Sequence, residues 1–178
     1  MLIKQATLRS ARSRERVVES YSAKAAFTAG RETAFLSHSH HDRQLAEGLQ
    51  TYLKEKGWNV YIDWLDESMP EKVSAETAVK LKGKIRECNL FLFLATANSC
   101  KLSRWCPWEI GIADGEKGTN RIIIVPTQDD NGHEYGSEYL GIYRKITEEY
   151  NIAKSTFSPA IVPLNGTPTF INYYRATI

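Results

Sequence analysis

The chain has 178 residues, of which 42% are hydrophobic and 25% are charged, and its formal net charge is +2. This length supports one hydrophobic core and is too short for two ordinary domains. The longest continuous apolar run, residues 90–95, is far shorter than the roughly 20 residues that cross a bilayer, so we expect a soluble protein with no membrane span.

Cysteine content and charge distribution narrow the class of protein further. The cysteines, Cys88, Cys100 and Cys106, are odd in number and lack zinc-type spacing, which favours a reducing, cytoplasmic location. Residues 1–24 hold six basic side chains against two acidic ones, so the rest of the chain is slightly acidic. Nucleic-acid binding needs basic residues clustered on one face of the folded body. We therefore expect no nucleic-acid partner, and we expect residues 1–30 to form a basic, helical N-terminal arm.

From residue 31 onward, short apolar runs alternate with amphipathic stretches, a pattern typical of strand and helix units on a parallel sheet. Residues 33–37 are expected to form the first strand. Asp42 is the expected cap of the first helix, which ends at Gly57 and whose apolar face is Leu45, Leu49 and Leu53. Residues 59–64 are expected to form the second strand.

The middle of the chain repeats this pattern. After a polar loop at 66–72, a second helix carries apolar residues at spacings of three and four, namely Ala78, Leu81, Ile85 and Cys88. Residues 90–95 are continuously apolar, as expected of a central parallel strand covered on both faces. A third helix is expected to begin between Ser103 and Pro107 and to end at Gly118, followed by a fourth strand at 121–126.

The C-terminal part carries weaker signals. Residues 129–136 are rich in turn formers, and residues 137–146 predict a short helix whose apolar side is Tyr139, Leu140 and Tyr143. A fifth strand is expected between residues 150 and 163, and Thr167 followed by Pro168 predicts the start of a final helix. The element order gives a flavodoxin-like three-layer sandwich, with a central five-stranded parallel sheet and helices on both faces. This domain is expected to span residues 31–178.

Polar and aromatic residues collect where the predicted strands end. Ligands of such sheets bind beyond the carboxyl ends of the strands. The segments at these ends are "SHSHHD" (37–42), "DWLDES" (63–68), "TANS" (96–99) leading to "WCPWE" (105–109), and "PTQDD" (126–130). One rim of the sheet is therefore the expected binding edge.

Two blocks of this sequence resemble the Toll/interleukin-1 receptor (TIR) domain family, especially its bacterial single-domain members. The segment "AFLSHSHHDRQLAEGLQTYLKEKGWNVYIDW" is similar to the first strand, first helix and second strand of the family. Ser99, Trp105 and Glu109 resemble the pattern around the catalytic glutamate of NAD-consuming members. The resemblance covers about residues 31–146. Pro107 departs from it, because proline disfavours helix at the preceding residue, and we expect the helix to start there with Trp105 outside it.

The resemblance implies cleavage of the bond between nicotinamide and ribose in NAD+, with Glu109 as the catalytic residue. The pyridinium leaves as neutral nicotinamide and needs no general acid, so one carboxylate suffices where ordinary glycoside hydrolysis needs two. Glu109 would stabilise the cationic ribosyl transition state. The indole of Trp105 would hold the nicotinamide cation or stack on adenine, a contact worth about 1–2 kcal/mol when desolvated.

Other residues at the rim are the expected substrate contacts. The segment after the first strand precedes a helix N-terminus, which suits phosphates, so Ser37, His38 and Ser39 are expected to meet the pyrophosphate. The remaining expected substrate contacts are Asp63 and Trp64, at the end of the second strand, together with Ser99 and Trp105. We expect no metal, because the adjacent histidines diverge along the chain, and no cofactor, since NAD+ is the substrate.

Two classes of function follow. As an enzyme, the chain would release nicotinamide and give ADP-ribose, a cyclic ADP-ribose isomer, or transfer to another acceptor. The resemblance to the TIR component of Thoeris systems then implies an antiphage signal read by a separate effector. As a scaffold, the chain would signal by TIR–TIR self-association through residues 63–72 without catalysis. A thiol hydrolase built on Cys106 is disfavoured, because a buried thiol explains that residue better. A phosphoacceptor receiver is excluded, because the central strand ends in Ala95 without an aspartate.

Overall fold

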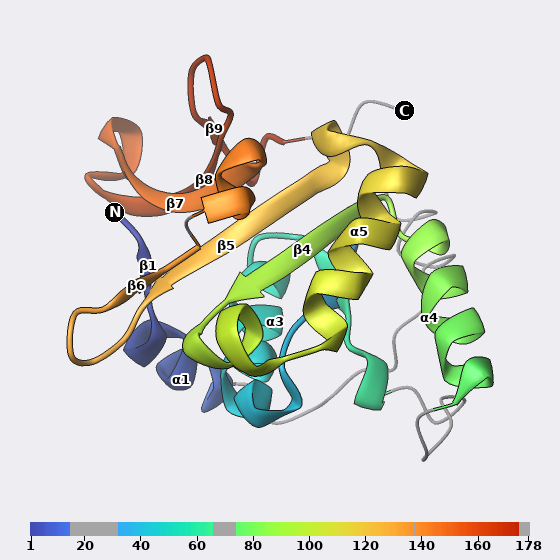
Figure 1. The fold of residues 1–178 in the computed structure, drawn as a ribbon. Coiled ribbons are helices and arrows are strands. Elements are labelled where there is room, and N and C mark those ends of the chain that lie inside the picture. The colour runs from blue at the N-terminus through green and yellow to red at the C-terminus, as the bar shows by residue number, and fades with distance from the viewer. Residues whose placement is uncertain (15–31, 66–73, 137, 175–178) are drawn as a thin grey trace.

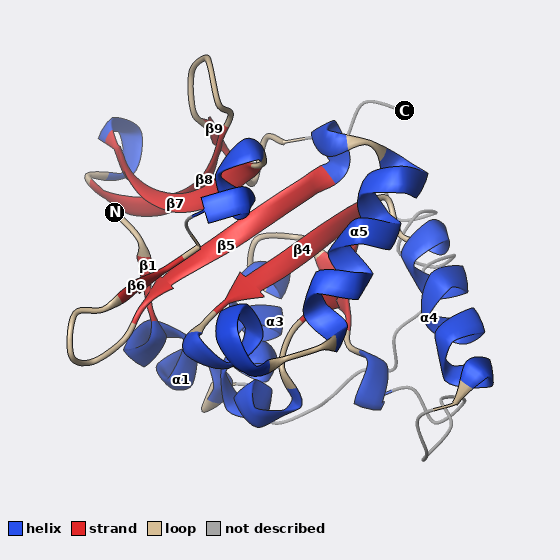
Figure 2. Cartoon of the chain, in the orientation of Figure 1, coloured by secondary structure: helices blue, strands red, loops and turns tan. Residues whose placement is uncertain are grey.

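The computed structural model describes residues 1–14, 32–65, 74–136 and 138–174. Its main sheet contains five neighbouring parallel strands and two further antiparallel strands at one edge (Figures 1 and 2). In spatial order these are β3 (Asn59–Tyr61), β2 (Thr33–Ser37), β4 (Leu90–Ala95), β5 (Ile122–Gln128), β7 (Arg144–Asn151), β8 (Thr156–Val162) and β9 (Thr169–Phe170). The predicted five-stranded parallel sheet is confirmed, and the antiparallel strands extend it.

Helices cover both faces of this sheet, as Figure 1 shows. One face carries α1 (Gln5–Arg12) and α3 (Arg43–Lys54), and the other carries α4 (Ala75–Glu87) and α5 (Trp105–Lys117). The flavodoxin-like three-layer arrangement is therefore confirmed. Within the described ranges, no helix is both long and apolar enough to cross a membrane.

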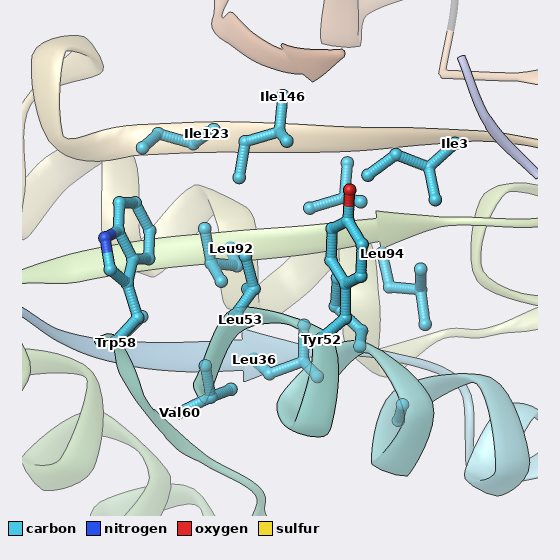
Figure 3. Close-up of a cluster of buried hydrophobic side chains, with 14 of the residues drawn as sticks. Ile3, Leu36, Tyr52, Leu53, Trp58, Val60, Leu92, Leu94, Ile123 and Ile146 are labelled. Carbon is cyan, nitrogen blue, oxygen red and sulfur yellow. The ribbon is translucent and has the colours of Figure 1, made fainter. Parts of the chain in front are cut away.

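Successive side chains of β4 point to opposite faces of the sheet and belong to two separate hydrophobic cores. Leu90, Leu92 and Leu94 face the cluster formed with α1 and α3, part of which Figure 3 shows. Phe91 and Phe93 face the cluster formed with α4 and α5. Because successive side chains of a strand point to opposite faces, a continuously apolar strand must be covered twice. The layered fold follows from this constraint.

The N-terminal segment joins the domain. The helix expected in residues 1–30 is present as α1, but Ile3 in the short strand β1 (Ile3–Lys4) pairs with Thr127 of β5, and Leu8 is fully buried. The helices α1 and α3 approach so closely at Gly48 that a Cβ there would lie 2.0 Å from the carbonyl oxygen of Leu8. Residues 15–31 lie outside the described ranges, so the boundary between residues 30 and 31 stays a prediction.

In the C-terminal part both predicted helices were wrong, whereas the strand expected between residues 150 and 163 is present but runs antiparallel. Residues 138–142 form one 3-10 turn, and the predicted helix is replaced from residue 144 by β7, the fifth parallel strand. The strand expected between residues 150 and 163 is β8, which is antiparallel to β7. Up to residue 174, the last residue that the structure describes, the helix predicted from Thr167 is absent, and residues 169–170 form β9. The fixed φ of Pro168 is compatible with extended backbone as well as with a helix start, so the signal was ambiguous.

The contact at Gly48 gives a stability prediction. Gly48→Ala should destabilise the fold by about 1–3 kcal/mol, because the added methyl group must displace backbone of α1. The matched control is Gly83→Ala in α4, where a Cβ meets nothing within 4 Å and the change should stabilise the helix by up to ~1 kcal/mol. Urea unfolding of the three proteins measures both effects. Equal stability of the two variants would contradict the close packing of α1 on α3.

Candidate active site

A cavity of about 510 Å³ lies at the expected edge of the sheet, beyond the ends of β2 and β3 and beside α4 and α5. Both α4 and α5 contribute to its wall. Its lining residues are His38, Ser39, His40, His41, Arg43, Asp63, Trp64, Thr77, Leu81, Leu102, Ser103, Arg104, Trp105 and Glu109. The volume is in the usual range for small-molecule sites.

Glu109 is the buried acid of this cavity, with a relative exposure of 6%. The pKa of its carboxyl is raised from 4.5 to about 8, mainly by burial; the hydroxyl of Ser37 opposes the rise and the nearby charge of Asp63 adds to it. No basic side chain in the described ranges forms an ion pair with Glu109. The cavity therefore contains an acid whose anionic form lacks a cation to stabilise it.

Two further polar atoms near Glu109 have no hydrogen-bond partner in the described part of the chain. Ser37 Oγ is buried and has no hydrogen-bond partner among the described residues, although it lies close enough to Glu109 to affect the pKa of that carboxyl. Asp63 Oδ1 is likewise shielded from solvent and unpaired. Buried polar atoms are normally paired, so unpaired ones beside a cavity indicate groups that a ligand would satisfy.

His38 is fixed in one orientation. Its Nδ1 lies 2.9 Å from the carbonyl oxygen of Leu36, which can only accept, so Nδ1 carries the proton of the neutral ring. The ring packs edge-on against Trp64, with centroids 4.3 Å apart. Burial lowers the pKa of His38 below its ordinary value, despite the nearby carboxylate of Asp63. The imidazole is therefore neutral at pH 7, and its Nε2 carries a lone pair.

Aromatic and cationic groups complete the cavity. Trp105 packs edge-on against Trp108, with ring centroids 5.3 Å apart. The Arg43 guanidinium lies 5.3 Å from the ring centroid of Trp64. Arg104 is exposed at the start of α5 and lines the same cavity. The site thus presents two indoles and two guanidinium groups around one buried acid.

The expectation that Pro107 would exclude Trp105 from the helix was wrong. The helix α5 starts at Trp105, because Ser103 Oγ accepts hydrogen bonds from the backbone N–H groups of Trp105 and Cys106 at 3.2 and 3.1 Å. In the first turn, Pro107 lacks only an N–H group that would have no partner within the helix. Trp105 and Glu109, four residues apart, therefore share one side of the helix and line one cavity.

The role expected for Asp42 was also wrong. Asp42 occupies the cap position of α3, but its carboxylate makes no capping hydrogen bond. Instead it accepts hydrogen bonds from Thr96 Oγ1 at 2.5 Å and from Asn98 Nδ2 at 2.7 Å, and so joins the segments that follow β2 and β4. Ser99 is fully buried in the same region and donates to the Leu94 carbonyl oxygen at 2.6 Å. The structure does not bring Ser99 to the cavity.

Most of the expected site residues come together. The cavity is lined by His38, Ser39, Asp63, Trp64, Trp105 and Glu109, and Ser37 lies behind it beside Glu109. Sequence reasoning missed Arg43 and Arg104, although each directly follows or precedes a motif that it had selected. Cys106 is fully buried, and burial raises the pKa of its thiol to about 12, which agrees with the preference for a structural thiol.

Comparison with known proteins agrees with this geometry. A family model described as the TIR domain matches residues 34–151. The chain belongs to the TIR domain family. The TIR domain is also 38% identical over 116 residues to the "Probable 3′ cyclic ADP-D-ribose synthase ThsB′" of Bacillus cereus (strain MSX-D12). That match covers 64% of this chain and 60% of the relative, so the chain spans about three fifths of the length of the curated relative it matches.

The buried acid of this TIR domain gives a pH-dependent stability. The folded protein holds the Glu109 proton up to a pKa of about 8, whereas the unfolded chain releases it near 4.5. Folded protein binds more protons between these values, so the free energy of unfolding falls as pH rises through this window. Each unit of pKa difference is worth ~1.4 kcal/mol. The free energy of unfolding of Glu109→Gln, measured relative to that of the original protein, should therefore rise by at least ~2 kcal/mol between pH 5 and pH 9.

The control for this measurement is Glu116→Gln on the same helix. Pairing with Arg86 lowers the pKa of Glu116, so this carboxyl titrates below the window and its replacement should leave the pH dependence unchanged. Chemical unfolding at several pH values gives the free energies. Parallel curves for the original protein and Glu109→Gln would contradict the raised pKa.

Proposed function

We propose that this TIR domain cleaves the bond between nicotinamide and ribose in NAD+, with Glu109 as the catalytic carboxylate and NAD+ as a substrate that requires no resident cofactor. The observation that supports this best is the buried, raised-pKa carboxyl of Glu109 in a cavity large enough for part of a dinucleotide. The relative's name, a synthase of 3′ cyclic ADP-D-ribose, agrees with the same bond being broken.

Substrate binding would itself prepare the acid. Free Glu109 is mostly protonated at pH 7, since its pKa is about 8. A pyridinium cation placed nearby favours the charged carboxylate and lowers that pKa. The proton leaves, and the carboxylate then stabilises the positive charge that grows on the ribose as neutral nicotinamide departs. A hydroxyl of that ribose would donate to the carboxylate of Glu109 itself.

The remaining parts of NAD+ match the cavity wall. The indoles of Trp64 and Trp105 suit the planar nicotinamide and adenine rings. Arg43 and Arg104 suit the pyrophosphate, because guanidinium groups form charge-assisted hydrogen bonds with phosphate oxygens. This assignment replaces Ser37 and His38 as the expected pyrophosphate contacts, because a hydroxyl and a neutral imidazole carry no positive charge for phosphate, while Ser39 lines the cavity.

The product and setting are part of the same proposal. The product is a cyclic ADP-ribose isomer made in the cytoplasm, where a separate effector reads it as an antiphage signal. Assembly through TIR–TIR contacts accompanies catalysis. The scaffold hypothesis would use residues 63–72 as an interface, and residues 66–72 of that segment lie outside the described ranges. A scaffold without catalysis leaves the raised pKa of Glu109 without a role.

Replacement of the acid tests catalysis directly. Glu109→Gln should lower the rate of nicotinamide release by at least ~100-fold, because loss of one charge-stabilising group of a transition state typically costs that much. Glu116→Gln, on the exposed side of the same helix, should keep the original rate. Chromatography with mass detection measures nicotinamide and ADP-ribose products, with circular dichroism to verify folding. Turnover that survives in Glu109→Gln would contradict the proposal.

Replacement of a rim cation tests substrate binding. Arg104→Gln should raise KM for NAD+ by ~10-fold or more and change kcat little, because a charge-assisted hydrogen bond to phosphate contributes about 1.5–3 kcal/mol to uniform binding. Lys101→Gln removes the same charge outside the cavity and serves as the control. Steady-state kinetics at fixed ionic strength separates the two parameters. An unchanged KM in Arg104→Gln would place the pyrophosphate elsewhere.

A further inference from the structure

Two hydrogen-bond acceptors face each other in the wall of the cavity. His38 Nε2 lies 3.7 Å from Asp63 Oδ1, which is too far for a hydrogen bond. Nε2 has no proton to donate, because the Leu36 carbonyl oxygen fixes the ring proton on Nδ1. Asp63 Oδ1 has no other partner among the described residues. The pair therefore lacks donors, and both residues line the cavity that contains Glu109.

The surroundings of His38 favour a neutral ring that can gain a proton. Burial keeps the imidazole uncharged, and the charged or titratable groups around it are Asp63, Asp42 and His40. A proton arriving on Nε2 would be stabilised by the Asp63 carboxylate, which already lies within ion-pair distance. Contacts with the Leu36 carbonyl oxygen and the Trp64 ring hold the imidazole in place. This arrangement is that of a general base.

We propose that His38 and Asp63 bind the vicinal hydroxyls of the adenosine ribose and that His38 removes the proton from the hydroxyl that closes the cyclic product. A ribose diol carries two neighbouring donors, which matches two neighbouring unpaired acceptors. The inference rests on the proposed function, because Glu109 engages the nicotinamide-bearing ribose and leaves the second ribose for this pair.

The step balances. The bond between the ribose anomeric carbon and nicotinamide breaks, and its electron pair leaves with neutral nicotinamide. The hydroxyl oxygen of the adenosine ribose forms a bond to that carbon, and its proton passes to His38 Nε2. The resulting imidazolium pairs with Asp63 until it loses the proton to solvent. Enclosure of the site favours this internal hydroxyl over water.

The test uses the intact protein and the product composition. His38→Asn retains an amide N–H that can reach the Leu36 carbonyl oxygen but removes the base. Asp63→Asn keeps the side-chain shape and removes the charge. His133→Asn, at an exposed histidine paired with Asp129, is the control. Each variant receives NAD+, and nicotinamide, linear ADP-ribose and cyclic product are quantified between pH 5 and pH 8.

We expect the original protein and His133→Asn to give mainly a cyclic product linked through an adenosine-ribose hydroxyl. In His38→Asn the rate of cyclic product should fall by ~100-fold, while nicotinamide release falls far less, so that linear ADP-ribose accumulates. Asp63→Asn should shift the ratio in the same direction. In the original protein the cyclic fraction should decline as the pH is lowered and His38 gains a proton, below the ordinary range of histidine because burial lowers its pKa, and His38→Asn should lack this dependence.

An unchanged ratio of cyclic to linear product in folded His38→Asn would overturn the inference. A purely linear product from the original protein, or a product linked through an adenine nitrogen, would overturn it equally and leave NAD+ cleavage by Glu109 intact. If His38→Asn does not fold, an unchanged ratio in Asp63→Asn overturns the inference. Cleavage that is absent or independent of Glu109 overturns both proposals.

Discussion

A carboxyl group buried without a counter-charge is the feature on which the rest of this site depends. Charges are rarely buried unpaired, because desolvation costs more than most single contacts return. Glu109 avoids that cost by holding a proton, and its pKa rises to about 8. The same desolvation makes a cationic ligand the natural partner of its ionised form. In the proposed reaction, the pyridinium of NAD+ supplies this cation.

The fold supplies this environment through the ends of its parallel strands. The neighbours β2 and β4 end side by side, and Asp42 joins the segments after them through Thr96 and Asn98. Ser103 starts α5 early enough for Trp105 to enter the helix, which aligns it with Glu109. The two cores on either side of β4 hold these elements rigidly. Local capping and core packing therefore combine to place one acid and two indoles around one cavity.

The parts of the fold that could be predicted from the sequence are those in which one signal dominates. The apolar run at 90–95 predicts a buried strand, and the spacing of Leu45, Leu49 and Leu53 predicts an amphipathic helix. The structure places β4 and α3 at these positions. Beyond residue 137 the signals conflict. The helical spacing of Tyr139, Leu140 and Tyr143 coincides with a single 3-10 turn. From residue 144 onward the chain instead pairs with β5 and β8 as strand β7.

The candidate site shows the same division between local and distant information. Glu109, Trp105 and the segment after β2 could be selected from motifs at strand ends. Ser99 could not be excluded, since its hydrogen bond to the Leu94 carbonyl oxygen depends on a turn that no motif specifies. The facing acceptors of His38 and Asp63 come from different strand ends, so their relation appears only in three dimensions.

The protonation of Glu109 can be measured directly by ¹³C NMR titration of its side-chain carboxyl carbon, with Glu109→Gln used to assign the signal. The expected midpoint in the free protein is near pH 8, and it should move down by at least ~1 unit when a non-cleavable, pyridinium-bearing NAD+ analogue binds. A midpoint near 4.5 in the free protein, or one that the analogue leaves unchanged, would contradict the central role given to this buried acid.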